Sequence, residues 1–262
     1  MTYKSSNEAE LVACIVQTKN LLLRRRFGLL LRPNNADRAR ARALVHSTLP
    51  GLAPQEKGAL VRALYESALI GEPGKGAVLD LGGADLSGAE LRGAELRYAD
   101  LASTNLTTSD LREVDLRWAN LARADLAQAD LRQANLRLAN LVEARLEGAD
   151  LADADLGAAD LSGAVLDGAD LQGAKLGGVD SKRDASAFLA ELVEEPAGGS
   201  PLGSKETSEH FRRLARLRRG PVSGTTLVGA SLRGANLAGA KVTRAQLGQA
   251  ASVEGAVLPE EI

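Results

Sequence analysis

The sequence is poor in aromatic residues. Only 3% of its 262 residues are Phe, Trp or Tyr, and there is a single Trp. Globular cores draw much of their buried area from aromatic side chains, so this chain must fill its interior with smaller ones. The hydrophobic fraction is still 45%, which argues against a disordered chain. Leu and Ala are left to form the core.

Reactive side chains are equally scarce. Cys14 is the one cysteine, which excludes an internal disulfide and suggests a reducing compartment. His46 and His210 are the two histidines, and neither has a Cys or a carboxylate at the spacing of a metal site. We therefore expect no cofactor, no metal and no enzymatic activity.

Long apolar runs are also missing. The stretch "LVACIVQ" is too short to span a bilayer, three Arg residues interrupt residues 20–32, and no signal peptide is visible. We expect a soluble, cytoplasmic protein. The cationic, Leu-rich residues 20–32 keep a membrane-surface contact as a less favoured alternative.

What the chain does contain is a repeat of five residues. Leu occupies every fifth position from Leu81 to Leu176, twenty times without a slip, and a weaker run follows over 227–258. A period of five fits neither the 3.6-residue turn of a helix nor the two-residue period of a strand. An internal repeat of this kind decides the architecture.

One unit shows how the repeat can fold. In "ADLAQ" at 124–128, Ala124 and Leu126 share one side of an extended stretch and Asp125 points away. The last two residues must turn a corner, where Gly often stands, as at Gly83 and Gly88. A chain of such bent sides must wind around its own Leu side chains.

This A(D/N)LXX pattern resembles the pentapeptide-repeat family over roughly residues 79–178 and 225–258. The resemblance implies a right-handed, four-sided parallel β-helix with four units per coil. We therefore predict a mainly β solenoid, a right-handed quadrilateral parallel β-helix with an N-terminal α-helical cap and a helical or looped insertion. The expected segments are the cap at 1–75, repeats at 76–180, the insertion at 181–224 and C-terminal coils at 225–262.

The cap and the insertion carry helical patterns. Leu60, Leu64 and Ala68 recur every fourth residue and predict a helix over 54–70. An earlier helix is expected over 36–49, with Asp37 as its N-cap. Within the insertion, residues 184–195 and 205–219 are helix-like.

Charge is divided unevenly along the chain. Residues 1–75 carry 12 basic and 6 acidic side chains, whereas residues 79–180 carry 9 basic and 19 acidic ones. Such asymmetry concerns association rather than fold. The two parts could attract each other or face different partners.

Candidate binding residues follow from the four-unit coil, because residues twenty apart should then stack. One corner column is apolar, and the column beside it is basic: Tyr98, Trp118 and Leu138, then Arg97, Arg117 and Arg137. Exposed aromatic residues beside Arg have the composition of a protein-binding hot spot. The equal alternative is that the chain's own helices cover this stripe.

A second candidate site lies in the insertion, where "HFRRLARLRR" contains Phe211, Arg212 and Arg213. This basic segment could dock on the acidic sides of its own rod or on an acidic partner. Direct nucleic-acid binding is not expected, since aromatic interleaving and a domain-wide basic balance are both missing.

Two functions are compatible with these features. The favoured one is a non-enzymatic scaffold that binds a protein partner of unknown identity. The alternative comes from a branch of the family that protects DNA gyrase from drugs or toxins by resembling DNA in width and negative charge. Two acidic sides and the insertion fit this alternative, and the Arg columns weaken it. A homodimer, which that branch forms through its C-terminal coil, is a further hypothesis.

Overall fold

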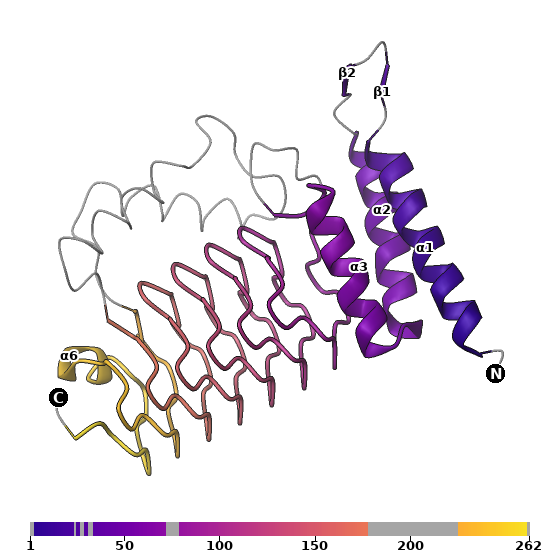
Figure 1. Ribbon diagram of the computed structural model, residues 1–262. Helices are drawn as coiled ribbons and strands as arrows, with labels where there is room; N and C mark the ends of the chain where they lie inside the picture. The colour runs from indigo at the N-terminus through magenta and orange to yellow at the C-terminus, as the bar shows by residue number, and fades with distance from the viewer. Residues whose placement is uncertain are drawn as a thin grey trace.

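The computed structural model describes residues 3–23, 25–26, 29–30, 34–71, 79–177 and 225–260. A stack of coils forms a rod, and helices close its N-terminal end (Figure 1). The regular elements are α1 (Tyr3–Leu22), β1 (Arg25–Arg26), β2 (Leu29–Leu30), α2 (Asn35–Thr48), the short 3-10 helix η1 (Leu49–Gly51), α3 (Pro54–Glu66) and α6 (Arg244–Leu247).

Each coil of the rod takes twenty residues, as the family resemblance implied. Parallel bridges pair Asp85 with Asn105, and Asn105 in turn with Asp125, and the same step recurs on every side. Leu86 N donates to Asn105 O at 2.8 Å, and Asn105 N donates to Ala84 O at 2.9 Å. The sides are so short that each contributes one bridge residue rather than an extended strand. The right-handed winding stays a prediction.

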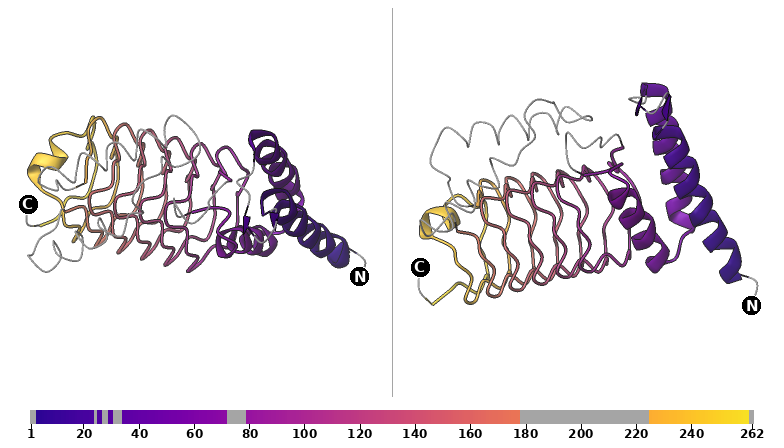
Figure 2. Two further views of the ribbon diagram at one scale, coloured as in Figure 1. Left: turned by 90° about the horizontal axis from the view of Figure 1, so that it is seen from above. Right: turned by 45° about the horizontal axis from the view of Figure 1, so that its top comes forward.

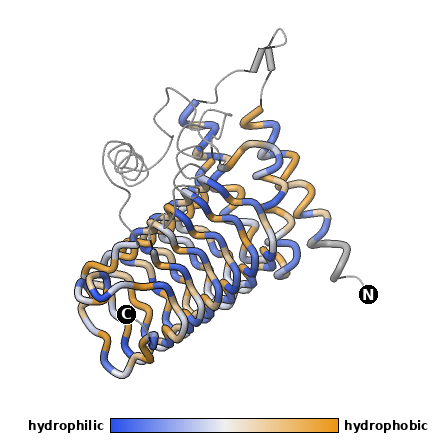
Figure 3. The backbone as a smooth tube through the Cα atoms, turned by 60° about the vertical axis from the view of Figure 1, so that its left-hand side comes forward, coloured by the Kyte–Doolittle hydropathy of each residue, from blue (hydrophilic) through white to orange (hydrophobic). Residues whose placement is uncertain are grey.

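The core is the column of Leu side chains inside the coils. Every Leu of the register from Leu81 to Leu176 is at most 1% exposed, and the residue two places before it, in most units an Ala, is buried beside it. Burying one Leu contributes about 1.5–3 kcal/mol. Apolar and polar positions therefore alternate along each coil (Figure 3).

The preference for Asp or Asn before each Leu has a local cause. Asp85 Oδ1 accepts a hydrogen bond from Ser87 N two residues on, at 3.1 Å, and the same contact recurs at other corners. At Asn105, Asn120 and Asn140 the side-chain amide also reaches the neighbouring coil, as in the 3.1 Å bond from Asn105 Nδ2 to Asp85 Oδ1. Both side chains therefore stabilise the corner.

The rod is closed at its N-terminal end by α3, which lies against the first coil, while α1 lies farthest from the coils (Figures 1 and 2). Glu90 N donates to Pro54 O at 3.0 Å, and Lys57 Nζ donates to Ser87 O at 2.9 Å. These contacts satisfy backbone groups that an uncovered edge would leave unpaired.

Several details of the helical cap differ from the prediction. Asn34, not Asp37, caps α2, because the Asn34 side chain accepts the Asp37 N–H at 2.8 Å. The β1–β2 hairpin and helix α1 had no expected counterpart. No helix in the described part of the chain is both long and apolar enough to cross a membrane.

The end of the rod departs from the twenty-residue step. Ser231 pairs with Ser252 and Asn236 with Val257, one residue more than the regular register. The short helix α6 lies between these coils, and its Thr243–Gln246 capping box explains why the chain turns helical there. The one extra residue is therefore accommodated at a single irregular corner.

Candidate interaction surfaces

The predicted corner column exists as a stack, which we call the aromatic stripe (Tyr98, Trp118 and Leu138). The rings of Tyr98 and Trp118 lie 5.8 Å apart with an interplanar angle of 17°. Their backbones are joined across the coils, since Trp118 N donates to Arg137 O and Tyr98 N donates to Arg117 O. The stripe is thus one continuous feature of the rod.

The stripe occupies corner positions that favour Gly. Tyr98, Trp118 and Leu138 have φ values of 60°, 65° and 61°. Bulky residues rarely adopt this left-handed conformation, and it carries a cost. At equivalent corners the chain places Gly83, Gly88 and others. The large side chains of the stripe must therefore gain free energy from what they contact.

The stripe is not an open surface, because Tyr98, Trp118 and Leu138 are 7%, 0% and 1% exposed. The chain itself buries them. The indole Nε1 of Trp118 is buried too, and no hydrogen-bond partner for it lies among the described residues. This agrees with the alternative in which the stripe is covered, and its role as a partner site stays a prediction.

The Arg residues beside the stripe are held by neighbours. Arg117 forms a bidentate pair with Asp115, with Nε–Oδ1 at 2.9 Å and Nη2–Oδ2 at 2.6 Å. The Arg97 guanidinium lies 5.7 Å from the centre of the Tyr98 ring. Arg117 and Arg137 also make further contacts of their own. This column contributes to the packing around the stripe.

The repeat is interrupted along the chain at the corner column that contains the aromatic stripe. The spacing between stacked residues changes from 20, as between Asn105 and Asp85, to 66, as between Asn236 and Asp170. The described chain stops at Gly177 and resumes at Thr225, whose N–H donates to Leu176 O at 3.0 Å. Phe211, Arg212, Arg213 and both helices expected in the insertion lie outside the described residues.

A second surface is a column of acids, which we call the carboxylate ladder (Glu90, Asp110, Asp130, Asp150 and Asp170). Each member pairs directly with the next in the parallel bridges. Like charges opposite each other on neighbouring strands destabilise a sheet. The ladder therefore needs compensation from other groups.

Two Arg residues provide part of that compensation. Arg112 binds Asp110 through Nε and Nη2, at 2.8 and 2.6 Å, and reaches Asp130 at 3.4 Å. Arg132 repeats the arrangement with Asp130 and Asp150. The hydrogen bond from Arg112 lowers the pKa of Asp110, and Arg132 does the same for Asp130.

The Arg residues that compensate the ladder end at Arg132, partway along this wall, by which we mean the side of the rod that carries the ladder. Ala152 and Gln172 occupy the corner positions that correspond to Arg112 and Arg132. Asp170 accepts hydrogen bonds from Gln172 N at 2.9 Å and Asn236 Nδ2 at 3.0 Å, which are neutral donors. Asp153 is exposed close by. The C-terminal half of this wall is consequently the more acidic half.

Groups suited to catalysis are sparse in the described part of the chain. Burial raises the pKa of the Cys14 thiol, which disfavours the reactive thiolate. Burial, followed by the charge of Arg42, lowers the pKa of His46. Within the described ranges, no three His, Cys, Asp or Glu residues are grouped so that they could hold a metal ion.

Comparison with known proteins identifies the class. The family profile for pentapeptide repeats matches residues 80–112, 109–148, 144–180 and 222–250. The chain therefore belongs to the pentapeptide-repeat family, and the matched ranges include most of the described residues that form the coils. No significant match was found among curated protein sequences.

Solved structures of the same family resemble parts of the chain. Rfr23 from the cyanobacterium Cyanothece 51142 is 41% identical over 31% of this chain and 55% of its own, with a TM-score of 0.31. The alignment thus spans about half of the Rfr23 chain. HetL from Nostoc sp. strain PCC 7120, involved in heterocyst differentiation regulation, is 27% identical over 68% and 70% of the two chains, with a TM-score of 0.23. Full-length QnrB1, a plasmid-mediated fluoroquinolone resistance protein, is 15% identical over 70% and 80%, with a TM-score of 0.27.

Proposed function

We propose that this protein is a non-enzymatic scaffold that binds a protein partner through the outer walls of its rod. The observation that supports this most directly is the carboxylate ladder. Its five acids are stacked one per coil; Arg112 and Arg132 contact Asp110, Asp130 and Asp150, whereas Asp170 accepts hydrogen bonds from neutral donors. A row of like charges destabilises the rod. A basic partner surface that pairs with the row would offset this cost, so the row is suited to binding such a partner.

The experiment uses a substitution that the fold already tolerates. In several repeat units Asn is the residue before the Leu, and it keeps the corner hydrogen bond, as Asn105 does. We expect Asp150→Asn with Asp170→Asn to abolish capture of the partner from host lysate. Asp85→Asn with Asp125→Asn removes the same charge from another wall and should leave capture intact. Equal capture by both variants, or equal loss, would contradict the assignment.

A second candidate function is binding to DNA gyrase as a DNA mimic. It is favoured by the regular spacing of the ladder, about 4.8 Å per coil, and by the acidic C-terminal half of that wall. A supercoiling assay with purified gyrase, with and without a quinolone, tests it. We would abandon this function if the protein had no effect at micromolar concentration, or if the Asp150/Asp170 variant were as active as the native chain.

Stability measurements can decide whether the aromatic stripe is internal packing or a partner site. Because Trp118 is fully buried, we expect Trp118→Ala to destabilise the fold by about 3 kcal/mol. Trp118→Phe keeps the stacking on Tyr98 and removes the buried Nε1, so it serves as the matched control. If Trp118→Ala left the thermal transition unchanged and abolished partner capture instead, the stripe would be a partner site.

A further inference from the structure

The outer face of α1 carries apolar side chains with nothing packed on them among the described residues. Val12 and Val16 are 54% and 49% exposed, and Ala9 and Ala13 beside them are exposed as well. The opposite face of α1 is already used, since Cys14 belongs to the buried core. Helix α1 is therefore apolar on two faces.

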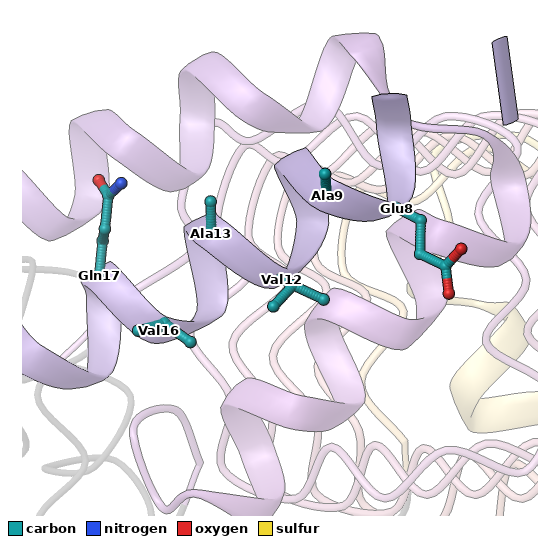
Figure 4. A pocket seen from close by; sticks show the side chains of 6 residues that line it. All are labelled: Glu8, Ala9, Val12, Ala13, Val16 and Gln17. Atoms are coloured by element: carbon teal, nitrogen blue, oxygen red, sulfur yellow. The ribbon is translucent and has the colours of Figure 1, made fainter. Parts of the chain in front are cut away.

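These residues form a shallow groove on the surface of the helix. Its volume is about 700 Å³, and six residues of α1 line it: Glu8, Ala9, Val12, Ala13, Val16 and Gln17. Figure 4 shows them as two rows, with Glu8, Val12 and Val16 projecting on one side and Ala9, Ala13 and Gln17 on the other. Such rows, four residues apart, are the ridges that pack into the groove of another helix.

The six residues are also symmetric along the helix. Reversing the chain direction about a point between Val12 and Ala13 exchanges Ala9 with Val16 and Glu8 with Gln17. A two-fold axis at that point would bring the same patch of two copies together in antiparallel orientation, as an isologous interface requires. The row that contains Val12 and Val16 would then lie against the smaller Ala9 and Ala13 of the other copy.

Charge favours the same arrangement. Lys19 lies eleven residues after Glu8, about three helical turns, so both project on the same flank of α1. In the antiparallel pair that flank meets its own copy, which places Glu8 of one molecule near Lys19 of the other. In a parallel pair Glu8 of one molecule and Lys19 of the other would stay eleven residues apart along the axis, about 16 Å, and could not pair.

We infer that α1 mediates an antiparallel homodimer of this protein. Since α1 lies at the outer end of the helical cap (Figures 1 and 2), the two rods would extend away from the contact and leave their walls accessible. The contact is one pair of helices, which is small for a protein interface, so the dimer should be weak. The inference stands whether or not the walls bind a partner.

Sedimentation velocity of the full chain tests the dimer. Between about 1 and about 100 µM, where modest interfaces associate, we expect a reversible shift from monomer to dimer. Val12→Glu with Val16→Glu should weaken it roughly tenfold or more. Val228→Glu, at a position 53% exposed on the rod, is the matched control and should leave it unchanged. Circular dichroism checks that all variants are folded.

Charge exchange tests the orientation. Glu8→Lys alone and Lys19→Glu alone should each weaken the dimer, and the double variant should restore it. A protein that stays monomeric up to about 100 µM would overturn the inference, including the case in which Val12 and Val16 are instead needed to bind anionic lipid vesicles. So would a dimer that the Val12/Val16 variant leaves intact.

Discussion

The rod and its helical cap are stabilised in different ways. In the rod the same few contacts recur in every coil, as with the stacked leucines and the corner hydrogen bonds of Asp or Asn. In the cap each contact is made once, as with Lys57 at Ser87 O and Arg62 at Arg92 O. A repeated contact can be read from the period of the sequence, whereas a contact made once can be seen only in three dimensions.

Loss of a stacked Leu should have the largest effect. We expect Leu131→Ala in the middle of the rod to lower the free energy of unfolding by about 3 kcal/mol, because neighbouring coils cannot close the cavity. Urea denaturation followed by circular dichroism measures it. Since coils support mainly their neighbours, the loss should also broaden the transition. A loss below about 1 kcal/mol would show that the core tolerates gaps.

Disrupting the contact between α3 and the rod should have the next largest effect. A Cβ added at Gly58 would lie 2.0 Å from Glu90 O. We therefore expect Gly58→Ala to destabilise the protein by about 2 kcal/mol, although Ala is the better helix former by about 1 kcal/mol. Amide hydrogen exchange should rise in α3 while the central coils stay protected. A Cβ added at Gly51 meets no atom within 4 Å, so Gly51→Ala is the control. A stabilised Gly58→Ala protein would contradict the close contact.

Acid should weaken the wall that carries the ladder. Arg112 and Arg132 lower the pKa of Asp110 and Asp130 in the folded state. Their contribution is therefore present above the unfolded value of about 3.9 and is lost as the pH falls below it. We expect the melting temperature of Asp110→Asn with Asp130→Asn to fall less steeply than that of the native chain below about pH 4. Parallel curves would mean that these pairs contribute nothing.

The smallest effects are expected at the corners. Gln133 has a φ of 60° and Gly93 has a φ of 64°, and a Cβ added at Gly93 would meet no atom within 4 Å. Gly93→Ala should cost about 1 kcal/mol, and Gln133→Gly should gain a fraction of that amount. Differential scanning calorimetry can resolve both shifts. Opposite signs would indicate that the corners are not strained.

The sequence predicted the rod well because its signal is repeated. The Leu register follows from the five-residue period. The twenty-residue coil and the stacking of Tyr98 on Trp118 follow once the family resemblance supplies four units per coil. The same reasoning failed for α1, because a helix that is apolar on two faces has no clear amphipathic pattern. It also chose Asp37 over Asn34 as a cap, although both are good capping residues three positions apart.

The candidate sites were less predictable than the fold. Sequence alone left open whether the stripe is covered, and only the burial of Trp118 indicates that it is. The acids of the ladder look like an ordinary solvated face in the sequence, since every repeat unit can carry one. Their importance appears only when Asp130 is seen between Arg112 and Arg132.

The central claim is that the protein acts through one wall of a stacked rod. Carboxyl-group labelling of the captured complex, read by mass spectrometry, tests this directly. The account predicts reduced labelling at Asp110, Asp130, Asp150 and Asp170, a footprint that recurs once per coil. Protection confined to the helical cap, or spread over all four sides of the rod, would contradict it.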